Sequence, residues 1–332
     1  MSSLSNSASI GATVKMVQHA KGLSVNDVTN NERIISKSTY YRFINGHSNI
    51  SVVCFLQLLE RLELTLQEFD FILHHYQIPP VEQLLQQIQN AVAKEDIGEL
   101  WKLKKQIDKL FNATHAHRYQ QLLTLTHLAL HHLETPQQAL DSTLRAALDG
   151  LIQDLLNLQL WSKYDLMLCR QIFTTLTPEQ QIILLTSANK SFHKYQRLTD
   201  EALTFMTFLA NQLFVAVHDK QPKLITKIYP IMTTINFPSD QLVPALLLKF
   251  CQGITDYVTK PNQPLTACRQ ALDIVHCLHI QYWDTIFQNV LLDLKTMPII
   301  TTRKTGSLLQ GYKPYVLASV SRRWLLCIKA KV

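Results

Sequence analysis

From Val81 to about Lys295, apolar side chains recur at the three- and four-residue spacing of amphipathic helices, and this pattern constrains the fold more than any other feature. Only 8 glycines occur in a chain in which 47% of the residues are hydrophobic. Prolines and capping residues interrupt the pattern about every 20 residues, so helix pairs repeat about every 40. We therefore predict an all-α protein whose larger part is a TPR-like helical-hairpin solenoid, although no tetratricopeptide consensus can be read.

Individual helix starts within this region follow from local chemistry. The segments T-P-Q-Q at 135–138 and T-P-E-Q at 177–180 each offer an N-cap threonine, a proline at the first helical position and a polar third residue. We expect a helix to begin at both. Before this region, Y-Q-I-P-P at 76–80 breaks the helical pattern, which predicts a linker at 77–80 followed by a helical-repeat domain at 81–297.

The first 76 residues have a different rhythm of five short helices. An amphipathic run with Ile10, Val14 and Val17 ends at a glycine, and Ser24 and Thr65 are each followed three residues later by an acidic residue, as in a capping box. This layout predicts an N-terminal five-helix bundle of the helix-turn-helix (HTH) type at residues 10–76. The polar residues 1–9 are predicted to be disordered.

The segment S-K-S-T-Y-Y-R-F-I-N-G at 36–46 has the properties of a DNA-recognition helix. Ser36 can cap the helix, and Tyr40 and Phe43, three residues apart, can face inward. The remaining polar and aromatic side chains would then surround a helix N-terminus that attracts phosphate. The candidate DNA-binding residues are Ser36, Lys37, Ser38, Thr39, Tyr41 and Arg42. An ordinary short surface helix is the alternative.

These segments resemble the N-terminal domain of the Rgg/GadR/MutR transcription regulators, a branch of the XRE-type HTH proteins. The matching pieces are K-G-L-S-V-N-D-V at 21–28, S-K-S-x-x-x-R-F-x-N-G at 36–46, N-I-S at 49–51 and L-x-L-T-L-x-E-F at 62–69. Two positions depart from the family pattern, because Tyr41 replaces a small serine and Ile44 replaces a glutamate that could orient Arg42.

The resemblance extends more weakly to W-S-K-Y-D-L-M-L at 161–168 and F-L-A-N-Q-L at 208–213. It implies a cytoplasmic homodimer whose repeat domain binds a short hydrophobic signalling peptide. Asn189 and Asn211 could pair with the backbone of such a peptide, and Arg170 could pair with a carboxylate on it. For each of the three, a solvated or locally capped side chain is the alternative.

The net charge of +7 is not by itself a nucleic-acid signature. Residues 295–332 hold eight Lys or Arg and no Asp or Glu, so the first 294 residues sum to 7 − 8 = −1. The segment 298–332 also loses helical spacing. We expect a poorly ordered basic appendage there, with a membrane-surface or DNA-contacting tail as the functional alternative.

Enzymatic, metal and membrane functions find no support in the sequence. No phosphate-binding glycine loop or nucleophile motif occurs, and the six scattered cysteines favour reduced, buried thiols. The pairs His127/His131 and His276/His279 lack the further ligands of a metal site, so we expect neither metal nor cofactor. No apolar run reaches the roughly 18 residues of a membrane span, which predicts a soluble, cytoplasmic protein.

Three functional hypotheses follow. The first is a DNA-binding transcriptional regulator switched by a peptide. The second is a small-molecule-responsive HTH repressor, and the third is a helical-repeat adaptor that does not bind DNA. Salt-dependent binding to duplex DNA would separate the adaptor from the two regulators.

Overall fold

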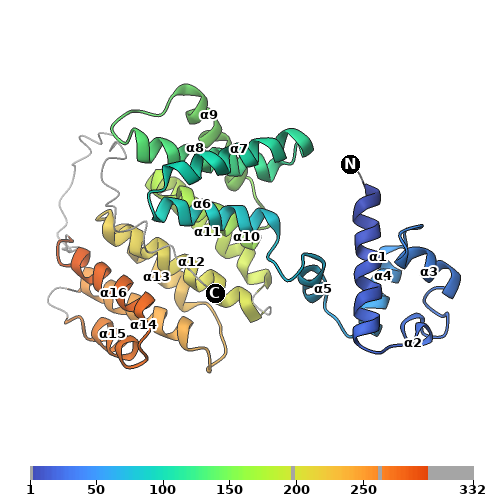
Figure 1. The fold of residues 1–332 in the computed structure, drawn as a ribbon. Helices are drawn as coiled ribbons and strands as arrows, with labels where there is room; N and C mark the ends of the chain where they lie inside the picture. The colour runs from blue at the N-terminus through green and yellow to red at the C-terminus, as the bar shows by residue number, and fades with distance from the viewer. Residues whose placement is uncertain (1–2, 196–198, 261–263, 298–332) are drawn as a thin grey trace. The chain divides into compact units, whose positions relative to one another are not determined.

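The computed structural model describes residues 3–195, 199–260 and 264–297 of the chain (Figure 1). The described residues contain α-helices, one short 3-10 helix and no strand, so the predicted all-α class is confirmed. Their bounds are α1 Ser3–Ala20, α2 Val25–Thr29, α3 Lys37–Ile44, α4 Val52–Arg61, α5 Leu66–Leu73, α6 Pro80–Ala93, α7 Ile97–Thr114, α8 His117–Glu134, α9 Ser142–Leu156, α10 Lys163–Ile172, η1 Phe173–Thr175, α11 Pro178–Tyr195, α12 Thr199–His218, α13 Pro222–Thr233, α14 Leu242–Thr259, α15 Thr266–Cys277 and α16 Gln281–Leu294. No helix in these ranges is long and apolar enough to cross a membrane.

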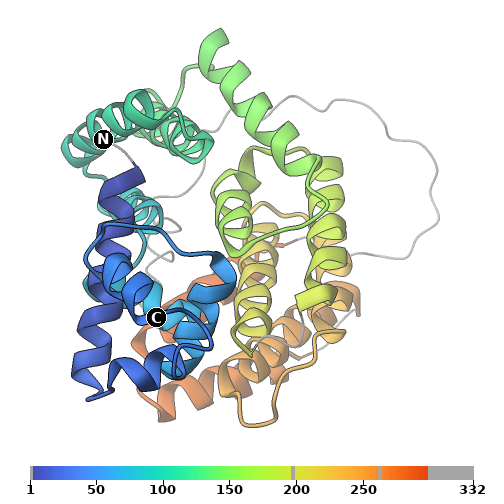
Figure 2. The same cartoon turned by 90° about the vertical axis from the view of Figure 1, so that its right-hand side faces the viewer.

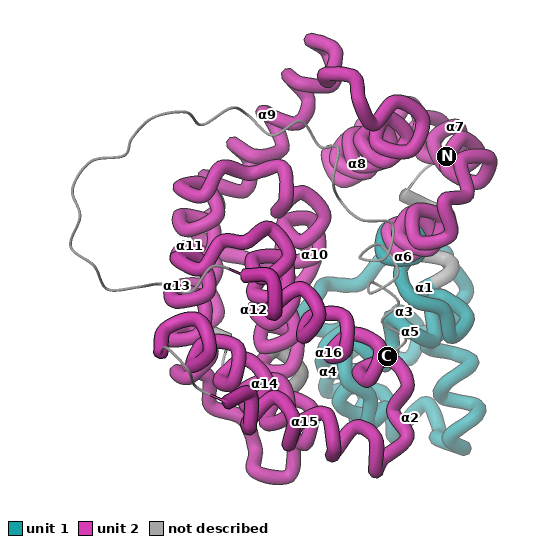
Figure 3. The backbone as a smooth tube through the Cα atoms, turned by 90° about the vertical axis from the view of Figure 1, so that its left-hand side faces the viewer, with its two compact units in different colours: residues 1–84 teal, residues 85–332 magenta. Residues whose placement is uncertain are grey.

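The chain divides into two compact units, residues 1–84 and 85–332 (Figure 3). The division falls within α6, a few residues beyond the predicted linker at 77–80, and residues 74–79 separate α5 from α6. The predicted tail at 298–332 lies outside the described residues.

The first unit is the predicted five-helix bundle. Ser24 and Thr65 each accept a hydrogen bond from the backbone N–H three residues on, and the acidic residues Asp27 and Glu68 bond back to them, so both capping boxes form. Helix α1 packs against α3 and α5, and α2 packs against α3 and α4. The apolar faces of these helices enclose one core, because each short helix is stable only when its hydrophobic side is covered.

Gly11 allows α1 to approach α3 closely. A Cβ atom built at Gly11 would lie 2.2 Å from the carbonyl oxygen of Phe43 and 3.0 Å from the Cα of Ile44. Real side chains do not approach a backbone so closely, so only glycine fits here without a shift of one helix. The orientation of α3 on α1 therefore depends on this residue.

The second unit is built from helical hairpins, of which α7/α8, α12/α13 and α14/α15 can be followed in Figures 1 and 2. Helix α12 is its central element, since it packs against α10, α11, α13, α14 and α16. A helix surrounded in this way must be apolar on most of its sides. The described side chains of α12 meet this requirement, with buried residues that include Phe205, Leu209, Leu213 and Val217.

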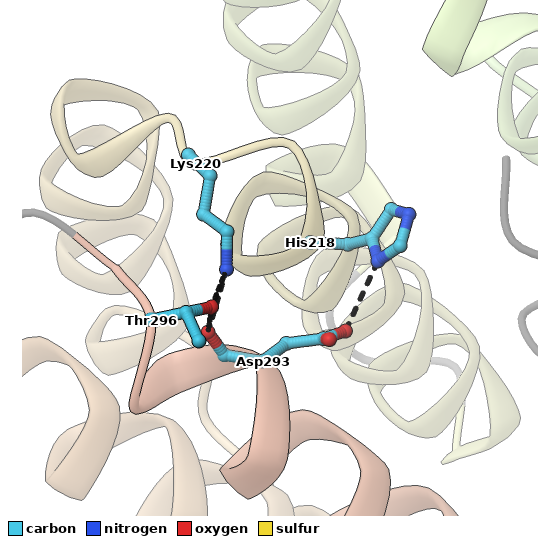
Figure 4. A network of polar contacts seen from close by, with 4 residues as sticks. All are labelled: His218, Lys220, Asp293 and Thr296. Atoms are coloured by element: carbon cyan, nitrogen blue, oxygen red, sulfur yellow. Dashed lines mark hydrogen bonds and ion pairs between the residues drawn. The ribbon is translucent and has the colours of Figure 1, made fainter. Parts of the chain in front are cut away.

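Helix α16 closes this unit against α12 and α14 through aromatic rings and a polar network. The rings of Phe250 and Phe287 stack with centroids 3.8 Å apart, and Phe214 meets both rings edge-on. At the end of α16, Asp293 accepts from His218 Nδ1 at 3.0 Å through its side chain (Figure 4). The Lys220 ammonium donates to the Asp293 carbonyl at 2.7 Å and to the Thr296 hydroxyl, so a cation meets the negative end of this helix.

Two element boundaries differ from those expected. Helix α1 begins at Ser3, inside the segment 1–9 for which disorder was predicted. The segment at 135–138 was expected to start a helix. Instead Thr135 ends α8 by donating its N–H to His131, and the following proline acts as a stop signal. Helix α9 is capped by Asp141, which accepts from the N–H of Leu144 at 2.8 Å.

Candidate functional site

Helix α3 presents the six candidate DNA-binding residues, and its start is fixed by its own cap. Ser36 Oγ accepts a 3.3 Å hydrogen bond from the N–H of Thr39, and the two hydroxyl oxygens lie 2.9 Å apart. The predicted start near Ser36 or Lys37 is confirmed. The Thr39 hydroxyl therefore takes part in the cap of its own helix, although the residue is exposed.

The inward side of α3 anchors the helix in the bundle. Tyr40, Phe43 and Ile44 are buried, as expected for the first two. The Tyr40 hydroxyl donates a 2.8 Å hydrogen bond to Gln18 Oε1 on α1, and Gln18 Nε2 donates to the carbonyl of Leu23. Burial raises the pKa of Tyr40 to about 12. Ile44 belongs to the core, so it leaves no carboxylate at that position.

The outward side of α3 offers donors, one aromatic ring and no negative charge. Ser38, Tyr41 and Arg42 are exposed and Lys37 is half-buried. The ring of Tyr41 is 49% exposed and meets Tyr40 edge-on, with centroids 6.2 Å apart, which limits its motion. The candidate residues therefore share one surface whose rigid base is the buried face of the same helix.

Charge around this surface favours an anion. Between Glu32 and Glu60 the sequence contains no acidic residue, whereas Arg33, Lys37 and Arg42 lie in this interval. This signal is visible in the sequence, where residues 1–50 hold five Lys or Arg and two Asp or Glu. Among the described residues Arg42 has no ion pair, so its guanidinium remains available for phosphate or a base edge.

The three candidate peptide-binding residues lie on successive helices of the second unit, Arg170 on α10, Asn189 on α11 and Asn211 on α12. Helix α12 packs against both α10 and α11. Arg170 Nε and Asn189 Oδ1 are buried without a hydrogen-bond partner, whereas Asn211 is partly buried and has no such orphaned atom. Two of the three candidates thus present unused polar groups in the interior.

Further unpartnered amides in the same helices were not singled out from the sequence. Gln212 on α12 is fully buried, and neither its Nε2 nor its Oε1 has a partner. Gln171 Nε2 on α10 is also orphaned. Because native proteins pair nearly all buried polar groups, such a concentration requires an explanation. A glutamine inside the apolar run at 208–217 was the available sequence signal.

The described residues contain no group of three or more His, Cys, Asp or Glu side chains arranged to hold a metal ion. The five cysteines in this part of the chain are free thiols. Cys169, Cys251 and Cys268 are buried as expected, and burial raises the pKa of each thiol. Cys277 is exposed, contrary to expectation, because it ends α15 on the outer side.

Comparison with known proteins identifies the family. Residues 102–289 match the sequence model of the C-terminal domain of the HTH-type transcriptional regulator Rgg. This match covers more than half of the chain, which therefore belongs to the Rgg family of transcriptional regulators.

Several solved structures have a similar fold. A protein from Listeria monocytogenes EGD-e assigned as a transcriptional regulator aligns with a TM-score of 0.70 and 18% identity over 88% of this chain and 100% of its own. The SHP pheromone receptor Rgg2 of Streptococcus dysgalactiae aligns with a TM-score of 0.64 and 18% identity over 86% and 99%. PrgX, solved as a complex with cCF10, aligns with a TM-score of 0.61 and 16% identity over 92% and 98%.

Proposed function

We propose that this Rgg-family regulator is a cytoplasmic homodimer that binds duplex DNA through α3 and changes its DNA occupancy when the second unit binds a short hydrophobic peptide. The observation that carries the proposal is the occurrence of both required surfaces in one chain. In the first unit, α3 carries Lys37 and Arg42 and no acidic residue, and the second unit has orphaned amides within a helical-repeat domain.

The DNA-binding part rests on the outward face of α3. The N-terminal residues of such a helix enter the major groove, while its free N–H groups and dipole attract phosphate. Arg42 can bind the O6 and N7 atoms of guanine, and Tyr41 can contact a thymine methyl group. Lys37, Ser38 and the cap residues Ser36 and Thr39 would contribute mainly phosphate contacts that position the helix.

The peptide-sensing part rests on the polar interior of α10, α11 and α12. An extended peptide brings unpaired backbone N–H and C=O groups, which must be satisfied when they leave water. Asn189 and Gln212 can donate and accept hydrogen bonds, so they match this need, and Asn211 lies beside Gln212 on α12. The SHP receptor Rgg2 and the PrgX complex with cCF10 have the same fold, which supports the same ligand class.

A homodimer follows from the geometry of DNA recognition. One HTH unit covers little DNA, whereas two units related by a two-fold axis read two half-sites about one helical turn apart. A peptide alters occupancy only if it binds two dimer arrangements unequally, and a tenfold effect on DNA affinity requires about 1.4 kcal/mol of difference.

The direct test uses the purified full chain and the duplex that lies upstream of its own coding sequence. Fluorescence anisotropy at several salt concentrations should give tight binding that weakens as salt rises, because bound phosphates release counterions. Synthetic hydrophobic peptides encoded near the gene should change this affinity. Binding of a random duplex with equal affinity and the same salt dependence would reject sequence-specific regulation. Light scattering that shows only monomers, with and without DNA, would reject the dimer.

A further inference from the structure

The connection between α2 and α3 is longer than a helix-turn-helix fold requires. Helix α2 ends at Thr29 and α3 begins at Lys37, so residues 30–36, seven in all, form the turn between them (Figure 1). An ordinary turn of this kind has about three or four residues. The turn leaves the core at Thr29, which is fully buried, and returns to it at Ile35, which is 9% exposed. Between these points residues 31–33 are exposed, so the extra length projects from the bundle.

The projecting part of the turn has an unfavourable backbone conformation. The φ angles of Asn30, Asn31 and Glu32 are 51°, 53° and 69°. Among residues with a side chain, asparagine tolerates this left-handed region best, whereas glutamate rarely adopts it. Such conformations persist only where the surrounding structure determines them, and they are concentrated at functional sites.

Thr29 supplies the contacts that determine this conformation. Its hydroxyl accepts a 3.4 Å hydrogen bond from the N–H of Glu32, and its carbonyl accepts one of 3.2 Å from the N–H of Ile34. The same hydroxyl donates to the carbonyl of Val25 at 2.8 Å. The residues on both sides of Arg33 are therefore bonded to one buried side chain and its own backbone, which fixes the position of Arg33.

Arg33 carries a positive charge that the protein does not neutralise. It is exposed, and its guanidinium forms no hydrogen bond or ion pair with any residue that the structure describes. Because it lies three residues before the cap residue Ser36, its Cα is within about 11 Å of the start of α3. The major groove is about 12 Å wide, so phosphates flank a helix in the groove at a distance that this side chain can reach.

We propose that the turn at residues 30–36 is a second DNA-contact element, in which Arg33 binds a backbone phosphate beside the groove that α3 enters. Thr29 is the positioning residue for this contact. The proposal rests on DNA binding through α3 and extends it, since Arg33 is not among the six candidate residues of that helix. The carboxylate of the adjacent Glu32 lies beside the same phosphates and opposes binding.

The first experiment measures binding of the full chain to its upstream duplex and to a random duplex by fluorescence anisotropy. Arg33→Gln should weaken both complexes by the same factor, because a phosphate contact does not depend on sequence. Loss of one such contact makes the salt dependence shallower, so the affinity ratio of wild type to variant should fall about 3.5-fold between about 50 and 200 mM salt. Arg33→Lys should retain most of the affinity. Arg145→Gln, which removes an exposed arginine from α9, should change nothing.

Glu32→Gln provides a test of opposite sign. It removes a negative charge from the residue next to Arg33, so it should strengthen binding to both duplexes, most of all at low salt. Unchanged binding by both Arg33→Gln and Glu32→Gln would place the turn away from the DNA and overturn the proposal. A loss confined to the upstream duplex in Arg33→Gln would also overturn it, because Arg33 would then contact a base.

The positioning role of Thr29 is tested through its dependence on Arg33. Thr29→Val removes the hydroxyl that holds the N–H of Glu32, so it should weaken DNA binding and reduce its salt dependence. In the Arg33→Gln background the same change should have no further effect on the salt dependence. Urea unfolding of each variant establishes that the first unit is folded under the binding conditions. An equal change in both backgrounds would show that Thr29 does not act through Arg33.

The contact by the turn and the proposed regulatory function fail in different ways. If the wild type binds both duplexes equally while Arg33→Gln weakens both, the contact stands and sequence-specific regulation is rejected. If the upstream duplex is bound specifically and Arg33→Gln has no effect, specific binding through α3 stands and the contact by the turn is rejected.

Discussion

The hydroxyl of Tyr40 donates a 2.8 Å hydrogen bond to the side-chain carbonyl of Gln18, and this buried contact joins α3 to α1. The two residues lie 22 positions apart in the sequence. Gln18 is held in turn by the carbonyl of Leu23, so both ends of its amide are used. The inward face of α3 is therefore oriented by a specific polar contact as well as by apolar packing.

Tyr40→Phe should destabilise the first unit by about 1–3 kcal/mol, because Gln18 Oε1 would remain buried without a donor. Tyr41→Phe is the matched control, since its ring is exposed and a surface change of this kind usually alters stability by less than about 0.5 kcal/mol. Urea unfolding of the full chain, followed by circular dichroism, measures both. Equal stability of the two variants would mean that the Tyr40 hydroxyl does not stabilise the bundle.

Gly11→Ala should destabilise the first unit by about 1–3 kcal/mol, because its methyl group would overlap the Phe43 carbonyl oxygen and force α1 away from α3. Gly150→Ala on α9 provides the opposite control. A Cβ at Gly150 meets no atom within 4 Å, so alanine there should stabilise the helix by up to about 1 kcal/mol. Urea unfolding of the full chain measures the stability of both variants. A stabilising effect of Gly11→Ala would contradict the packing described for α1 and α3.

Arg42→Ala should weaken specific DNA binding by about 1–3 kcal/mol if the guanidinium contacts a base, with a smaller loss for random duplex. If it contacts phosphate instead, affinity should fall equally for both duplexes and the salt dependence should become shallower. Arg145→Ala, an exposed residue on α9, should change neither. Anisotropy titrations measure these affinities, and unchanged binding of both duplexes by Arg42→Ala would exclude Arg42 from the interface.

Acid should destabilise the second unit through histidines of α8. The pKa of His127 is lowered by burial and by the charge of Lys104, against the opposite influence of Asp108 and Asp141. Burial and the neighbouring His131 likewise lower the pKa of His132.

In the unfolded chain these two histidines take up protons near pH 6.5, whereas in the folded chain they do so only at lower pH. The stability that the folded state gains from their neutral form is therefore present above pH 6.5 and is lost as the pH falls below it. Replacing both His127 and His132 by Gln should flatten the decline in stability between pH 6.5 and 5, whereas His19→Gln, at an exposed site, should not. Thermal unfolding across this range is the measurement, and an unchanged slope in the double variant would contradict the prediction.

Local chemistry in the sequence determined the helical class, several helix starts and the inward and outward faces of α3. Ser24, Thr65 and Thr177 cap helices through contacts with residues only three positions away, so their roles could be read directly. Tyr40 and Phe43 face the core because their three-residue spacing places them on one side of a helix. The family resemblance was also carried by such short segments.

Contacts between distant segments were decided only by the tertiary structure. Nothing near Gly11 in the sequence shows that the backbone of Phe43 lies against it, and nothing near Gln18 identifies Tyr40 as its partner. The segment at 135–138 has the composition of a helix start, but α8 extends to Glu134 and the proline ends it.

The same distinction applies to the candidate sensor site. Arginines and amides are common on helix surfaces, so the sequence could nominate Arg170 and Asn189 but could not show that Arg170 Nε and Asn189 Oδ1 are buried without partners. Their burial arises because α10, α11 and α16 all pack around α12, an arrangement that depends on the summed fit of many apolar side chains rather than on any local pattern.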